Sequence, residues 1–334
     1  MRKFFLLITF LNFQIIAYNQ VISGTIMDSK TDSTICFATI YFNGTFVGTS
    51  SDINGNFKLD ISKNASMTLT VSSVGYYSVT LTDYLTDKPL IVYLEPKIFE
   101  INDVFVSAKS LAGKRKANLR LFKNEFLGRT ANARSCEIIN ENDITFNYDS
   151  DRDTLKAFAL KPIIIYNKAL GYKITYYLDK FEYYRKSKSF NYIGNIVFNE
   201  DLSTNDTDKK LYEEGRKNSY FGSRMHFLRA LWLNELESSG FAIKNSDNIN
   251  LNYDSIVINE FSNLNIEQTM FNKLIASSFK LYIYYNSEIS GIVFRKPKVY
   301  FDETGYYDST GITWLGDFAE KRIGDTLPLN YEPK

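Results

Sequence analysis

The sequence predicts a mainly β protein, in which a seven-stranded β-sandwich precedes an α+β domain built on an antiparallel sheet. Residues 21–94 contain short segments of alternating apolar and polar residues separated by turn residues, which is typical of sandwiches. Residues 115–334 mix such segments with stretches of helical spacing. The chain also contains 24 Tyr and 26 Phe, which pack well on pleated surfaces.

Residues 1–20 have the pattern of a signal peptide. Arg2 and Lys3 precede the mostly apolar run Phe4–Ile16, and a short polar segment follows. As a helix that run would span about 20 Å, less than the roughly 30 Å of a bilayer's hydrocarbon core. We therefore expect an exported protein with no transmembrane helix after signal removal.

The sandwich is predicted over residues 21–94. Asn43 and Gly44 tolerate positive φ, which predicts a two-residue hairpin turn. The expected strands cover residues 21–27, 37–42, 45–51, 57–61, 67–71, 76–81 and 90–94. Shared-face alternation places six side chains inside one antiparallel sandwich: Ile40, Phe42, Phe57, Leu59, Leu69 and Val71.

This region resembles the carboxypeptidase-regulatory-like domain. The residues that carry the resemblance are Ser23–Ile26, Ala38–Phe42, Gly48–Phe57 and Val74–Tyr76. The resemblance implies a non-catalytic, prealbumin-like sandwich of the kind found in exported proteins of Bacteroidetes-type bacteria. It does not imply carboxypeptidase activity.

Residues 95–114 are predicted to connect the two domains. Apolar residues at alternate positions favour a further strand over 98–106, and the small and basic residues 110–116 are typical of a linker.

The second domain is predicted over residues 115–334. Short helices are expected over 118–127 and 207–216. A longer helix is expected over 220–236, ending before Gly240 and packing on strands 172–184 and 279–285. Its apolar face would hold Phe221, Met225, Leu228, Trp232 and Leu236. Further strands are expected over 144–148, 155–160, 172–184, 192–198, 249–258, 279–285 and 291–294.

This half resembles an uncharacterised region that follows the sandwich in a group of Bacteroidetes exported proteins. Four sets of residues carry the resemblance: Phe126–Thr130 with Asn132 and Ala133; Asn167–Tyr172; Tyr220–Ser223 with His226–Leu231; and Arg322–Asp325 with Leu327–Tyr331. The resemblance implies no named activity.

Charge and cysteine content limit the partners. The chain has 39 basic and 38 acidic residues, which gives no reason to expect nucleic acid as a partner. The two cysteines, Cys36 and Cys136, fall in different predicted domains. We expect two free thiols, with one disulfide between them as the alternative.

The catalytic candidates all depend on His226, the single histidine of the chain. A zinc carboxypeptidase needs two histidines and a carboxylate, so that class of enzyme is excluded. We interpret His226 as a half-buried structural residue, and keep a catalytic base or a partner contact as alternatives. Ser223 or Cys136 could serve as its nucleophile, but neither has a supporting motif. We therefore predict no catalytic, cofactor-binding or metal-binding residues and no cofactor.

Two other stretches of the sequence allow a functional interpretation as well as a structural one. Asp52, Asn54 and Asn56 imitate the start of a calcium loop, but Lys63 stands where its final glutamate would be. A hairpin turn is the preferred interpretation. Residues 182–188 mix basic and aromatic side chains, which indicates a solvated turn or a contact with a polyanion or glycan.

The sequence thus favours an exported, non-enzymatic protein of the periplasm or outer membrane, with a binding or assembly role. Its partner would be an envelope protein or a glycan. An enzyme of unknown type with its site in 115–334 is the alternative, and an outer-membrane barrel-associated protein is a further one.

Overall fold

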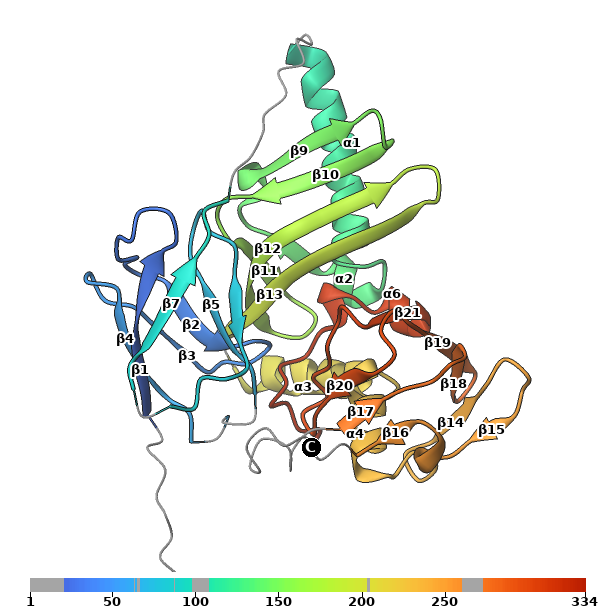
Figure 1. Ribbon diagram of the computed structural model, residues 1–334. Helices are drawn as coiled ribbons and strands as arrows, with labels where there is room; N and C mark the ends of the chain where they lie inside the picture. The colour runs from blue at the N-terminus through green and yellow to red at the C-terminus, as the bar shows by residue number, and fades with distance from the viewer. Residues whose placement is uncertain are drawn as a thin grey trace, which may run out of the picture.

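The architecture is known from a computed structural model, which describes residues 21–62, 64, 67–86, 88–97, 108–202, 205–259 and 273–334. The predicted fold class is confirmed: the protein is mainly β, with an N-terminal seven-stranded region and a later antiparallel sheet accompanied by helices. Buried apolar residues form three separate clusters. Figure 1 shows the corresponding three parts, with the sandwich in blue and cyan.

The sandwich consists of two sheets that enclose one apolar core. One sheet has the order β4 (Asn56–Asp60), β1 (Val21–Asp28) and β7 (Leu90–Leu94). The other has the order β3 (Gly48–Ser50), β2 (Thr39–Phe42), β5 (Leu69–Ser72) and β6 (Val79–Leu81). All six side chains predicted to lie inside are buried. The sandwich is not wholly antiparallel, because β1 and β7 pair in parallel.

The two-residue turn predicted at Asn43 and Gly44 is wrong. The β2–β3 pairing ends at Tyr41 and Gly48, so the loop between the strands is longer. Gly44 does adopt a positive φ of 80°. The extra residues make contacts outside the sandwich, which a tight turn could not reach.

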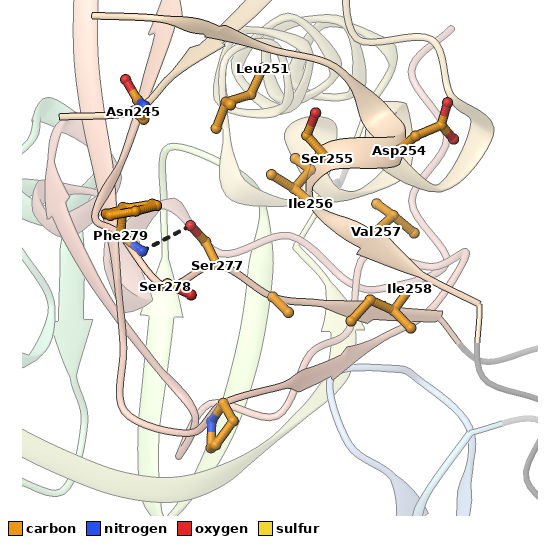
Figure 2. Close-up of a pocket in the computed structure, with 12 residues that line it drawn as sticks. Asn245, Leu251, Asp254, Ser255, Ile256, Val257, Ile258, Ser277, Ser278 and Phe279 are labelled. Carbon is orange, nitrogen blue, oxygen red and sulfur yellow. Dashed lines mark hydrogen bonds between the residues drawn. The ribbon is translucent and has the colours of Figure 1, made fainter. Parts of the chain in front are cut away.

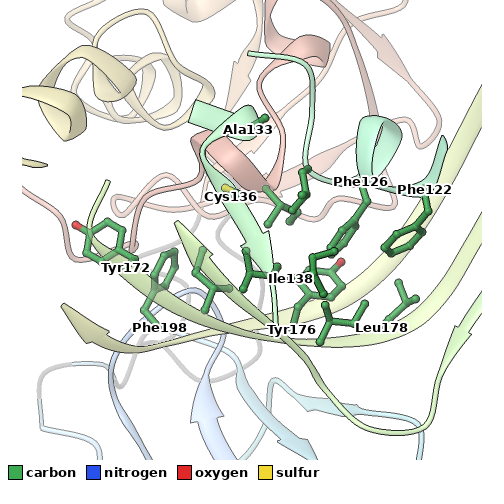
Figure 3. Close-up of a cluster of buried hydrophobic side chains, with 14 of the residues drawn as sticks. Phe122, Phe126, Ala133, Cys136, Ile138, Tyr172, Tyr176, Leu178 and Phe198 are labelled. Carbon is green, nitrogen blue, oxygen red and sulfur yellow. The ribbon is translucent and has the colours of Figure 1, made fainter. Parts of the chain in front are cut away.

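The second part is a curved antiparallel sheet covered on one face by a helix. Its strands are β8 (Cys136–Ile138), β11 (Ile163–Asn167), β12 (Tyr172–Tyr184), β10 (Thr154–Ala159) and β9 (Ile144–Asp149) in spatial order, with β13 (Ser189–Asp201) paired to β12. Helix α1 (Ala108–Phe126) lies along this sheet (Figure 1). Phe122 and Phe126 point from α1 toward β12, as Figure 3 shows, and the ring centroids of Phe126 and Tyr176 are 4.8 Å apart.

The linker predicted over residues 110–116 is wrong, because the chain forms helix α1 there. Residues 110–116 lie within it, and the helix begins ten residues before the predicted start at Asn118. Lysine, arginine and alanine are good helix formers, so the basic composition of this stretch was misleading. The strand predicted over 98–106 lies outside the described residues.

The third part contains the second apolar core of the predicted α+β domain. Its larger sheet has the order β15 (Asn250–Leu251), β14 (Phe241–Lys244), β18 (Leu281–Tyr285), β19 (Glu288–Phe294) and β21 (Ile312–Gly316). A smaller sheet has the order β16 (Val257–Ile258), β17 (Lys273–Ile275) and β20 (Val299–Phe301). The helices here are α4 (Arg224–Leu233) and α6 (Asp317–Glu320), whereas α3 (Asp206–Tyr220) packs on the second part, where Tyr220 joins the apolar cluster and Arg216 Nε donates to the Leu170 carbonyl. Short α2 (Ala131–Arg134) and the 3-10 turns η1 (Glu141–Asp143), η2 (Tyr253–Ser255) and η3 (Ile323–Asp325) lie in connections.

The helix predicted over 220–236 is shorter than expected: it is α4 (Arg224–Leu233), and Tyr220 is the last residue of the preceding helix α3. Gly222 has a φ of 69°, which ends the α3 segment, and the Ser223 hydroxyl caps α4 by accepting a hydrogen bond from the His226 backbone N–H. Helix α4 ends at Asn234, which adopts the left-handed conformation, and not at Gly240.

The apolar face predicted for this helix is partly wrong, because some of its side chains are not fully buried. Most of helix α4 shares an apolar core with β18, and its Met225 packs against the other core, which contains residues of β12. The fully buried positions are Phe227, Leu228 and Leu231, whereas Phe221 is 40% exposed and Trp232 is half-buried. Among the described residues, no helix combines the length and apolar character that crossing a membrane requires.

The sandwich is docked on the curved sheet through its β2–β3 loop. Ile196 of β13 exchanges hydrogen bonds with this loop: its N–H donates to Asn43 Oδ1 (2.8 Å) and its carbonyl accepts from the Gly44 N–H (2.8 Å). The Phe198 N–H donates to the Thr45 carbonyl at 3.0 Å. The loop therefore satisfies backbone groups on the outer side of β13, which would otherwise be an open sheet edge.

Side chains reinforce this docking. The Tyr41 and Tyr177 rings stack with centroids 5.8 Å apart, and Lys97 Nζ lies 3.2 Å from Asp179 Oδ1 in a mostly buried ion pair. Burial raises the pKa of Asp179, and Lys97 opposes that shift. We expect this buried pair, with one partner on each unit, to favour one relative placement of the units.

Candidate functional site

Residues from three of the four sets singled out in the second half, together with Ser219 beside the remaining set, meet at one partly buried cluster. The Asp325 cluster consists of Thr130, Asn132, Asn167, Ser219 and Asp325. Asp325 accepts hydrogen bonds from the Thr130 hydroxyl (2.8 Å) and the Asn132 amide (2.9 Å). The Asn132 amide also donates to Ser219 Oγ at 2.8 Å. Asn167, fully buried, donates to the Gly324 carbonyl at 2.9 Å.

The Asp325 cluster acts as a structural joint, which here means a set of polar contacts that holds separate segments of the chain together. Burial raises the pKa of Asp325, and hydrogen bonds from Thr130 and Asn132 oppose that shift. Nearby, burial raises the pKa of Cys136 to about 12, so its thiol stays protonated and weakly nucleophilic at neutral pH. The cluster joins α2, η3 and the end of α3: Thr130, Asn132, Ser219 and Asp325 are linked by hydrogen bonds, and Asn167 bonds to the backbone of Gly324.

A buried ion pair extends this joint. Arg322 Nη1 lies 2.8 Å from Glu125 Oε2 and also donates to the Asn124 and Glu125 carbonyls. The Arg322 guanidinium lies over the Phe190 ring, with 4.2 Å to the centroid. Arg129 forms a second ion pair with Glu125. These contacts connect the C-terminal segment to α1 and the β12–β13 hairpin.

His226 lies in an aromatic cage. Its ring centroid is 5.0 Å from that of Tyr220, 4.9 Å from that of Phe241 and 5.7 Å from that of Tyr285. Its Nδ1 accepts a hydrogen bond from the Gly222 N–H at 3.2 Å. Burial lowers the pKa of His226 to about 4, and the nearby positive charge of Arg229 acts in the same direction.

The nucleophiles considered for His226 are placed elsewhere. The Ser223 hydroxyl contacts the His226 backbone N–H at 3.1 Å as a helix cap, so the contact between these residues is not made through the imidazole. The Cys136 thiol donates weakly to the Asn132 carbonyl at 3.4 Å. Cys36 is exposed and Cys136 is buried, and both are free.

The segment resembling a calcium loop forms a tight turn. Asp52 Oδ1 accepts hydrogen bonds from the backbone N–H groups of Asn54 (2.8 Å) and Asn56 (2.9 Å). Gly55 adopts a φ of 78°, and Asn56 Oδ1 accepts from the Thr25 hydroxyl at 2.8 Å. Across the part of the chain that the structure describes, no group of three or more His, Cys, Asp or Glu side chains could hold a metal ion.

A groove of about 580 Å³ opens beside β16 and β17 (Figure 2). Its lining combines Leu251, Ile256 and Ile258 with polar side chains, of which Asp254 is the one ionisable group among the described lining residues. Ser277 Oγ already accepts a hydrogen bond from the Phe279 N–H at 3.1 Å.

A second groove, of about 380 Å³, lies between α1 and the β12–β13 hairpin, and we name it the α1 groove. Its lining residues are Ala117, Asn118, Arg120, Leu121, Asn124, Tyr183, Arg185 and Lys188. Three of these side chains are cationic, and no carboxylate occurs among the described residues of the lining. The Arg185 guanidinium lies over the Tyr148 ring, with 4.7 Å to the centroid.

The α1 groove contains three of the seven residues of the basic and aromatic stretch recognised in the sequence. Tyr183, Arg185 and Lys188 come from residues 182–188. Arg120 comes from α1, more than sixty positions earlier, and the spacing of the sequence carries no signal that the two segments meet.

Comparison with known proteins concerns the sandwich. Residues 22–106 match the CarboxypepD_reg-like domain family, so the resemblance predicted for this region is confirmed. The matched family is a regulatory-like domain and not the catalytic domain of a carboxypeptidase. No curated protein matches the chain significantly.

Proposed function

We propose that the protein is an exported, non-enzymatic component of the cell envelope with a binding or assembly role, and that its partner is an envelope protein or a glycan. The family match over residues 22–106 supports a non-catalytic module. The charged and apolar pattern of residues 1–20 supports export.

The observation that carries the proposal is the fixed docking of the sandwich on the curved sheet. Backbone hydrogen bonds to Ile196 and Phe198 and the mostly buried Lys97–Asp179 pair hold the module in one orientation. A fixed orientation joins the surfaces of two units into a single larger one. Such a surface suits a protein that holds or positions a partner in the envelope.

Cell fractionation tests export and the envelope role. The full-length chain is expected in the envelope fraction with its N-terminus near Val21, as measured by immunoblotting and N-terminal sequencing. Leu7→Arg interrupts the apolar run of residues 1–20, so this control variant should remain in the cytoplasm with an uncut N-terminus.

Two results would contradict the proposal. Wild-type chain found in the cytoplasm with residues 1–20 intact would contradict export. Chain released as a free species, cross-linked to no envelope protein and bound to no envelope glycan, would contradict the binding role.

A further inference from the structure

Arg120 and Lys188, two of the three cations of the α1 groove, differ from Arg115 and Lys123 of α1 in having no internal partner. Arg115 donates to the Glu141 and Ile144 carbonyls at 2.8 Å each, and Lys123 pairs with the Glu141 carboxylate at 2.6 Å. Arg120 and Lys188 are exposed and make no hydrogen bond or ion pair with any residue that the structure describes. The net charge of the whole chain is only +1, so this gathering of cations is local.

The carboxylates near the groove in sequence are already engaged. Glu182 Oε2 accepts from the Tyr184 hydroxyl at 2.6 Å and pairs with Lys180 at 3.0 Å. Asp153 Oδ1 accepts from the Tyr148 hydroxyl at 2.5 Å. The positive potential of the groove is therefore left for a ligand from outside the chain.

The groove is built on rigid elements. Helix α1 is anchored by the fully buried Phe122 and Phe126, and Tyr183 packs against the same apolar core. Arg185 rests on the Tyr148 ring. Side chains held in place before binding lose less conformational entropy when a ligand arrives.

The uncharged groups of the groove identify the kind of anion. Asn118 and Asn124 present carboxamides, which donate and accept hydrogen bonds as sugar hydroxyl groups require. Tyr183 offers only part of its ring, because the rest packs on the core, so it is a poor platform for stacking nucleic-acid bases. The volume of about 380 Å³ falls in the usual range of ligand clefts, about 300–1,000 Å³.

We infer that the α1 groove binds an anionic polysaccharide, with Arg120, Arg185 and Lys188 contacting its acidic groups and Asn118 and Asn124 contacting its hydroxyl groups. This inference rests on the proposed function and names its glycan partner by chemical class.

The test measures binding of purified mature full-length protein to polygalacturonate by titration calorimetry, with neutral dextran of equal length as the uncharged comparison. Wild-type protein is expected to bind polygalacturonate, to bind more weakly as salt is raised, and to bind dextran at least tenfold more weakly. The double variant R120E/R185E is expected to lose at least tenfold in affinity, because it reverses two groove charges.

Matched variants separate the groove from general surface charge. Lys58 on β4 and Lys210 on α3 are exposed cations outside the lining, so K58E/K210E makes the same charge change and should keep affinity within about twofold. N118A/N124A should weaken polygalacturonate binding roughly fivefold or more. Thermal melts of each variant check that the fold is retained.

Several outcomes would overturn the inference. Absence of wild-type binding to polygalacturonate would do so, as would equal losses in K58E/K210E and R120E/R185E. Single-stranded DNA or polyglutamate binding as tightly as polygalacturonate would show that the groove does not select a saccharide. If binding fails while the chain is still exported and cross-linked to an envelope protein, the inference falls and the proposed function stands.

Discussion

The sandwich and the remainder of the chain are held together in different ways. In the sandwich, fifteen buried apolar residues form one cluster between two sheets of short strands. In the remainder, the Asp325 cluster and the Glu125–Arg322 pair connect separate segments beside the apolar cluster that contains Phe126, Ala133 and Ile323. Apolar packing is tolerant of detail, whereas buried polar groups require particular partners. The comparison suggests that the sandwich is the robust unit and the joint is the specific one.

The largest expected effect tests the apolar unit. Phe57 is 4% exposed in the sandwich core, so Phe57→Ala should lower the free energy of unfolding by about 3–5 kcal/mol. Denaturant melts measure this loss. Ile91 is 65% exposed on the same sheet, and Ile91→Ala should change stability by less than about 0.5 kcal/mol. Equal losses in the two variants would show that the sandwich core is not the source of its stability.

The polar joint is tested by removing one partner of its buried pair. Arg322→Met leaves Glu125 buried with Arg129 as its remaining ion-pair partner, and should cost about 3 kcal/mol. The double variant E125Q/R322M also removes the buried negative charge of Glu125, so it should be more stable than Arg322→Met alone. Strictly additive losses in melts of the two single variants and the double variant would contradict coupling across the joint.

A pH series tests the remainder of the chain, because His226 is the single histidine and lies on α4. Its pKa in the folded protein is about 4, below the value of about 6.5 expected in the unfolded chain. The unfolded chain therefore binds more protons between these values, and stability should fall as pH drops from about 6.5 to 4, by up to about 3 kcal/mol. His226→Asn offers a non-titrating acceptor to the Gly222 N–H, so melts should show a shallower pH dependence. An unchanged slope would assign the effect to other groups.

The smallest effect concerns Trp232, which packs at the edge of the apolar cluster that contains Phe227 and Leu228 of α4. Its ring is half-buried, with its centroid 5.9 Å from that of Phe301 and Lys273 Nζ 4.8 Å from the ring centroid. Trp232→Ala should cost about 1–2 kcal/mol, below the range of about 3–5 kcal/mol for a fully buried aromatic. Iodide should quench its fluorescence only in part. Full quenching with no loss of stability would make Trp232 a surface residue available to a partner.

Local patterns in the sequence determined the sandwich. Alternation along β1 and β4 and the turn chemistry of Asp52 and Gly55 act over a few residues, so they can be recognised without a tertiary structure. The predictions for this region were wrong where the chain makes distant contacts. The β2–β3 loop is longer than two residues, and it reaches β13.

Tertiary structure decided the helices of the remainder and the candidate sites. The break at Gly222 lies inside a regular apolar repeat, and the sequence did not show whether the helix would continue through that glycine. Residues 110–116 were assigned to a linker, although the structure places them in α1, which anchors on the curved sheet through Phe122.

The sequence by itself determined the fold class, the sandwich with its family, and the expectation of export. Periodicity and composition carry that information, because they reflect which side chains face water. Only the tertiary structure brought Arg120 beside Arg185 and Thr130 beside Asp325. Such contacts depend on how sheets and helices that are far apart in the chain pack together, and no local pattern of the sequence encodes them.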